Sequence, residues 1–153
     1  MDIAGLLALI GSPVQQVFLL ATLAVMAIGL VFGDRSVRIG IGLVLANFVL
    51  TAFVDHWVWL TIRAAVAVLD GGLFGLLVIL AWRSRRWWAH AAAAFALLGF
   101  FAHFIALFDQ SIWWRAYVGL RWIFSAAVVL ALLAGVAETP FARSYERWAA
   151  RQG

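Results

Sequence analysis

The chain has 153 residues, of which 67% are hydrophobic and 12% charged, with a formal net charge of +4. Soluble domains carry roughly one quarter charged residues, so this composition excludes an ordinary water-soluble protein and predicts a membrane protein. The length allows about five spans of roughly 20 residues, and we expect no separate soluble catalytic domain. All eleven cationic residues are arginines and cysteine is absent, which excludes lysine Schiff-base and cysteine thiolate chemistry.

Five apolar segments separated by short polar gaps predict an all-α membrane helix bundle that forms a single transmembrane domain over residues 1–153. A short interfacial helix is expected at residues 3–10, before the Ser12 and Pro13 helix-start signal. No basic residue precedes the first span, so we expect it to be retained and not cleaved as a signal peptide. The predicted spans are residues 13–33, 37–54, 61–82, 87–108 and 115–136.

Arginine placement predicts the orientation of these spans in the membrane. The arginines gather in alternate gaps, whereas the gaps containing Asp55 and Asp109 are acidic or neutral. Because cytoplasmic loops are enriched in arginine, we expect the N-terminus outside and the C-terminus inside. Interfacial tryptophans agree with this topology, with Trp57, Trp59, Trp113 and Trp114 expected at the outer interface and Trp82, Trp87 and Trp88 at the inner one.

Residues 141–151, which follow Pro140, are predicted to form an amphipathic helix on the inner membrane surface. Aromatic side chains gather on one helical side and arginines on another, and each arginine is worth about 1 kcal/mol near anionic headgroups. The bilayer is therefore an expected partner, and nucleic acid is not, since no folded basic domain is present. The predicted membrane-surface residues are Arg143, Arg147, Trp148 and Arg151.

Four polar residues from four different spans are predicted to share one layer of the membrane. Asn47, Asp70, His103 and Arg121 each lie roughly 8 to 12 Å from the outer end of their helix, at about 1.5 Å per residue. Charges facing lipid are costly, so we expect Asp70 to turn inward and pair with Arg121. Arg63 lies on the same face of the helix as Asp70 and can supply a second cation from above.

Two interpretations of this polar layer remain open. It is either a buried ion pair that fixes the register of the helices or a proton or ion site. In the second interpretation, His103 exchanges protons with Asp70, because histidine side chains titrate close to neutral pH.

Small residues recur at four-residue spacing in four of the spans, which is typical of closely approaching membrane helices. They are expected either to pack within the chain or to form an interface with another copy or partner. The pairs are Gly29 with Gly33, Gly42 with Ala46, Gly71 with Gly75, and Ala92 with Ala96.

The motifs of several enzyme classes are absent from the sequence. It contains neither an HExxH zinc motif nor a GxSxG turn, and Asp70 has no second intramembrane carboxylate with which to form a catalytic pair. We therefore expect no enzymatic activity, no metal and no resident cofactor.

A different signal surrounds His103. The segment from Gly99 to His103, followed by residues 112–115, resembles the small-x-x-x-His pattern and downstream tryptophans of bacterial antenna polypeptides that bind bacteriochlorophyll. That resemblance implies His103 as the pigment ligand, and a haem is the related alternative. His90 lies about 20 Å away along the same helix and cannot share a metal with His103.

Residues 68–70, 83–88 and 103–109 resemble small multispanning proteins of unassigned function from alpha-proteobacteria. This resemblance implies a bacterial inner-membrane location and supplies no activity. From size, small-residue stripes and aromatic surfaces, we predict a non-catalytic accessory or assembling subunit that packs against copies of itself or other membrane subunits. The alternatives are a small proton or ion channel or transporter that uses Asp70, His103 and Arg121, and a pigment- or haem-binding subunit.

Overall fold

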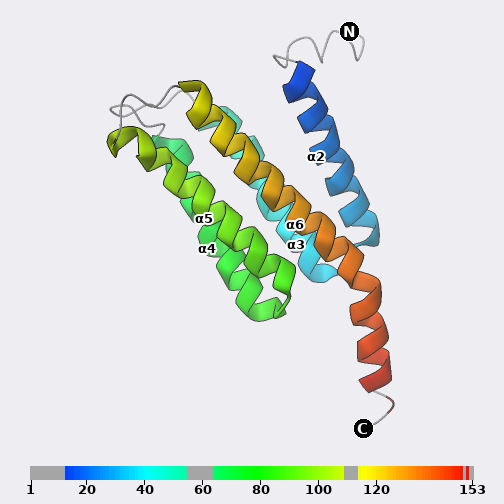
Figure 1. Cartoon of the computed structure of the whole chain (residues 1–153). Coiled ribbons are helices and arrows are strands. Elements are labelled where there is room, and N and C mark those ends of the chain that lie inside the picture. Colours follow the sequence, from blue (N-terminus) through cyan, green and yellow to red (C-terminus); the bar gives the residue numbers. More distant parts are fainter. Residues whose placement is uncertain (1–12, 55–63, 109–113, 150, 152–153) are drawn as a thin grey trace.

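The protein is an all-helical bundle in the computed structural model, which describes residues 13–54, 64–108, 114–149 and 151. Helices α3 to α6 lie side by side, and α2 runs next to α6 (Figure 1). No strand occurs in the described ranges, which confirms the predicted all-α bundle. The helices are α2 (Pro13–Phe32), α3 (Arg35–Val54), α4 (Ala64–Ser84), α5 (Trp87–Phe108) and α6 (Trp114–Ala149). The short helix predicted at residues 3–10 lies outside the described residues.

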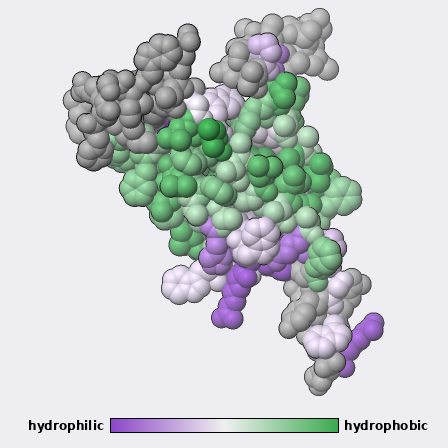
Figure 2. Space-filling model, in the orientation of Figure 1, coloured by the Kyte–Doolittle hydropathy of each residue, from purple (hydrophilic) through white to green (hydrophobic). Residues whose placement is uncertain are grey.

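Four helices are long and apolar enough to cross a membrane by length and composition. Figure 2 shows an apolar band across the described helices, with hydrophilic residues gathered mainly at one end. The chain is therefore a multi-pass membrane protein. The apolar part of α2, Gln16–Phe32, is shorter than the other four. The four candidate spans are Arg35–Val54, Ala64–Ser84, Trp87–Phe104 and Gly119–Phe141.

Helix α6 differs from the expectation of a span that stops at residue 136 and a separate surface helix at 141–151. It continues through Pro140 to Ala149 as one helix of 36 residues. Proline removes the N–H that would bond the carbonyl of Val136, and this favours a bend more than an end. Side-chain hydroxyls donate to backbone carbonyls before and after the proline. Thr139 donates to the Gly135 carbonyl and Ser144 to the Pro140 carbonyl, each at 3.0 Å. The C-terminal part of α6 takes a new direction in Figure 1.

Two short turns lie at the same end of the bundle. Asp34 caps the start of α3, because its Oδ1 accepts a hydrogen bond from the Val37 amide at 2.9 Å. At the end of α4, Arg85 adopts a left-handed backbone with φ of 53°, and its amide donates to the Ala81 carbonyl at 3.0 Å. These compact caps hold the exposed Arg35, Arg38, Arg83 and Arg85 together at one end of the apolar band.

The core is built around the alanine-rich face of α5. Ala89, Ala92 and Ala96 are buried there, together with Leu77 from α4 and Leu132 from α6. Short side chains on α5 allow both neighbouring helices to approach closely.

Trp88 is a core residue, although it was predicted to mark the inner interface. Trp82 and Trp87 are 81% and 60% exposed, but Trp88 is 1% exposed. One residue further along a helix lies about 100° around its axis, which turns Trp88 inward. A Cβ added at Gly135 on α6 would meet the Trp88 ring at 2.8 Å, and one added at Gly40 on α3 would meet it at 3.2 Å. Trp88 therefore fills the space between α3 and α6.

Candidate functional site

Asp70 is the centre of a polar cluster that joins four helices. Its Oδ1 accepts a hydrogen bond from Asn47 Nδ2 of α3 at 3.0 Å. Its Oδ2 lies 2.8 Å from His103 Nε2 of α5 and 3.7 Å from Arg121 Nη2 of α6. We call Asn47, Asp70, His103 and Arg121 the Asp70 cluster. The structure thus brings together the four residues predicted to share one layer, with His103 nearer to the carboxylate than Arg121.

The Asp70 cluster is largely enclosed by protein. The side chain of His103 has no exposed surface, and those of Asp70 and Arg121 are 17% and 24% exposed. A carboxylate in apolar surroundings is stable only when donors and a counter-charge replace water. Donors from three helices meet this requirement. When Asp70 is ionised its carboxylate can only accept, and the hydrogen bond then places the proton on Nε2 of His103.

Local packing beside Asp70 explains how His103 reaches it. Gly71 follows Asp70 in α4, and a Cβ at Gly71 would lie 3.1 Å from the Phe100 ring of α5. The missing side chain at Gly71 therefore lets α4 and α5 approach at this level. His103 follows Phe100 by three residues and so lies on the same side of α5. Phe104 stacks edge-on against Phe100 at 5.1 Å, and this contact further fixes the aromatic side of the helix.

The other predicted site residues are described only in part. Arg63 lies outside the described residues. Arg143 and Arg147 belong to α6, but their side chains lie outside the described part of the structure. Trp148 is 55% exposed and Arg151 is also exposed, positions compatible with the predicted contact with a membrane surface.

A second ionic cluster, which was not predicted from the sequence, lies at the turn end of the bundle. Arg86 Nη2 is 3.4 Å from Asp34 Oδ2, and Arg86 Nη1 is 3.2 Å from Glu138 Oε1. The Asp34 amide also donates to Thr139 Oγ1 at 3.4 Å. We call Asp34, Arg86, Glu138 and Thr139 the Arg86 cluster. It ties both short turns to α6.

The sequence contains a signal for this second cluster, but a weak one. Asp34 looks isolated among arginines, and Glu138 follows the last predicted span. Two acids in regions otherwise rich in arginine are candidates for ion pairs. Which arginine each acid meets depends on how α6 passes the turns, and spacing along the chain does not give that.

Histidine geometry bears on metal and pigment binding. His90 Nδ1 bonds the Arg86 carbonyl at 2.9 Å, near the turn end, far along α5 from His103. Within the described ranges no three His, Cys, Asp or Glu side chains gather as a metal site. Nε2 of His103 is already bonded to Asp70, and a pigment on this side chain would need open space that its enclosed ring lacks.

Comparison with protein-family models, with curated proteins and with solved structures finds no match to this chain. The functional argument therefore depends on its own residues.

Proposed function

We propose that the protein is a non-catalytic membrane subunit that assembles with copies of itself or with other membrane proteins. The observation that carries this proposal is a small-residue stripe left open on α3. Gly42 has no side chain within 4 Å of its Cβ position, and Ala46, one turn further along, is exposed. In a membrane, such stripes allow another helix to approach closely.

The other small-residue pairs serve packing within the chain. A Cβ at Gly29 would overlap Ile41, a Cβ at Gly71 would press on Phe100, and Ala92 and Ala96 are buried. These contacts account for three of the four predicted pairs, in whole or in part. The Gly42 and Ala46 stripe is left over, which favours an external helix as its partner.

The Asp70 cluster supports the same function, because its donors hold α3, α4, α5 and α6 in one arrangement. A subunit that offers a fixed surface to a neighbour benefits from such a fixed bundle. For orientation, we propose the N-terminus outside and the C-terminus inside a bacterial inner membrane. The exposed arginines at the two short turns support this proposal.

The test is the oligomeric state of the full chain in nanodiscs, measured by native mass spectrometry. The wild type is expected to form particles with several chains or a foreign subunit, and Gly42→Leu is expected to shift them to single chains. Gly72→Leu is the matched control, since Gly72 on α4 is also open. A monomeric wild type, extracted from its own membrane without a partner, would contradict the proposal.

A second candidate function is proton or ion transport through the Asp70 cluster. The specific observation in its favour is the 2.8 Å contact between a fully enclosed His103 and Asp70. Ionisable residues at this depth are functional candidates in membrane proteins. In liposomes, Asp70→Asn should abolish pH-dependent flux, whereas Arg86→Gln, in the other cluster, should retain it. Equal flux in wild type and Asp70→Asn would eliminate this candidate.

A further inference from the structure

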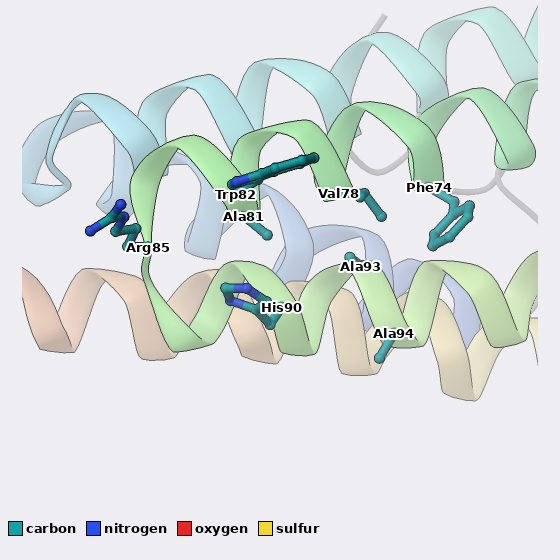
Figure 3. Close-up of a pocket in the computed structure, with 8 residues that line it drawn as sticks. All are labelled: Phe74, Val78, Ala81, Trp82, Arg85, His90, Ala93 and Ala94. Atoms are coloured by element: carbon teal, nitrogen blue, oxygen red, sulfur yellow. The ribbon is translucent and has the colours of Figure 1, made fainter.

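A groove of about 570 Å³ runs along the outer side of α4 and α5. In Figure 3, Phe74, Val78 and Ala81 on α4 lie opposite Ala93 on α5, and Ala94 also lines the groove although its methyl group points away from α4. Ala81 and Ala93 are buried and form the floor, because their short side chains leave room between the two helices. This part of the groove is apolar and suits a hydrocarbon chain.

The groove ends in basic residues near the α4–α5 turn. Arg85 and His90 line it there, beside the exposed indole of Trp82 (Figure 3). Acidic side chains are missing from the described lining. His90 Nδ1 donates to the Arg86 carbonyl, which makes Nε2 an acceptor in the neutral ring, so Arg85 supplies the positive charge at this end of the groove. Interfacial tryptophans and arginines mark the depth of lipid headgroups.

We propose that this groove binds an anionic phospholipid. One acyl chain lies on the floor formed by Ala81 and Ala93, and the headgroup phosphate meets Arg85, with the His90 ring beside it. Charge complementarity selects this occupant over a zwitterionic lipid or a quinone, because a net negative headgroup suits a mouth lined by Arg85 and by no acidic side chain in the described structure.

The backbone at the mouth of the groove fixes where this charge lies. Arg85 is held in the left-handed conformation by the end of α4, and its amide is bonded to Ala81 in the groove floor. The cation is thus built into the same turn that closes the groove. Arg83 is exposed two residues earlier and does not line the groove. The two arginines therefore provide a matched pair for an experiment.

The experiment measures dioleoyl-phosphatidylglycerol and dioleoyl-phosphatidylcholine binding to the full chain by native mass spectrometry, as the Kd of the first bound lipid. The wild type should prefer phosphatidylglycerol by at least about fivefold, the contribution of one arginine near a headgroup. Arg85→Asn should remove most of this preference, since asparagine tolerates the left-handed backbone. Arg83→Gln should retain the preference although it loses the same charge.

Ala94→Phe tests the hydrocarbon part of the groove independently of the turn. Its ring should fill the groove and weaken both lipids by a similar factor. Equal affinity of the wild type for the two lipids would overturn the proposal. So would equal losses in Arg83→Gln and Arg85→Asn, or an unchanged Kd in Ala94→Phe. The melting temperature of each variant serves as the control for folding. A value within a few degrees of the wild type, which corresponds to roughly 1 kcal/mol of unfolding free energy for a chain of this size, would establish that the bundle is intact.

Discussion

The two ionic clusters hold the bundle in opposite ways. In the Asp70 cluster, one carboxylate inside the apolar band is bonded to donors from three helices. In the Arg86 cluster, one cation at the polar end bridges two carboxylates, and all three side chains are about one fifth exposed. Oε2 of Glu138 lacks a partner within the described structure, whereas both oxygens of Asp70 are bonded. The two clusters therefore differ in completeness: the interior carboxylate is fully paired, whereas the cluster at the polar end leaves one buried carboxylate oxygen, Oε2 of Glu138, unpaired among the described residues at a cost in free energy.

The largest expected effect comes from removing the charge at the centre of the interior cluster. Asp70→Asn removes the carboxylate that binds Asn47 and His103 and faces Arg121, and it should lower the free energy of unfolding by about 3 kcal/mol. Thermal and denaturant unfolding of the detergent-solubilised chain measures this loss. The double variant Asp70→Asn with Arg121→Gln should recover part of it, because the cation that faced the lost carboxylate is removed as well. A loss below about 1 kcal/mol would mean that the carboxylate is not a structural tie.

The next largest effect is expected where Gly135 of α6 packs against the buried ring of Trp88. Gly135→Ala would place a methyl group 2.8 Å from the Trp88 ring, so the buried indole must shift. Such overpacking should cost about 2 kcal/mol in unfolding free energy. Gly75→Ala is the control, since nothing lies within 4 Å of its Cβ position and alanine favours the helix. If Gly135→Ala is as stable as Gly75→Ala, Trp88 is not wedged between the helices.

A smaller effect is expected at the Arg86 cluster. Arg86→Gln breaks two ion pairs that are partly solvated and should cost about 1 kcal/mol in unfolding free energy. Because salt screens solvated charges, this cost should shrink when unfolding is measured in high salt. The cost of Asp70→Asn should change little under the same conditions. Equal salt dependence in the two variants would remove the proposed distinction between the clusters.

The smallest effect tests the contribution of single donors. Asn47→Leu removes one neutral donor from Asp70 while Arg121 and His103 stay, and it should cost about 0.6 kcal/mol, an average value for hydrogen bonds between membrane helices. The same unfolding assay resolves this value when several replicate curves are fitted together. A cost equal to that of Asp70→Asn would show that the amide, and not the charge, holds the cluster.

Much of the fold could be predicted from the sequence because hydrocarbon imposes strict requirements. The segment 87–108 coincides with α5, and 37–54 begins two residues after α3 does. The layer shared by Asp70, His103 and Arg121 could also be anticipated, since charges at that depth turn toward one another.

Other features depend on three-dimensional neighbours that no pattern specifies. Trp88 and Trp87 are adjacent and chemically identical, yet only the packing of α3 and α6 decides which is buried. The partners of Arg86 likewise depend on the path of α6. Pro140 is expected from the sequence to separate the last span from a surface helix, but it lies within a continuing helix in which the hydroxyls of Thr139 and Ser144 bond neighbouring carbonyls.

Helix α6 contributes Arg121 to one cluster and Glu138 to the other, 17 residues apart in sequence. At about 1.5 Å and 100° per residue, the two positions are separated by roughly 26 Å and by a set rotation around the axis. The number of residues between Arg121 and Glu138 therefore fixes the direction in which each side chain leaves the helix relative to the other. Inserting a single residue between them would turn one contact by about 100° relative to the other, so both could not engage together. The segment from Arg121 to Glu138 therefore cannot gain or lose even one residue without breaking a cluster, although the side chains within it that face lipid can vary.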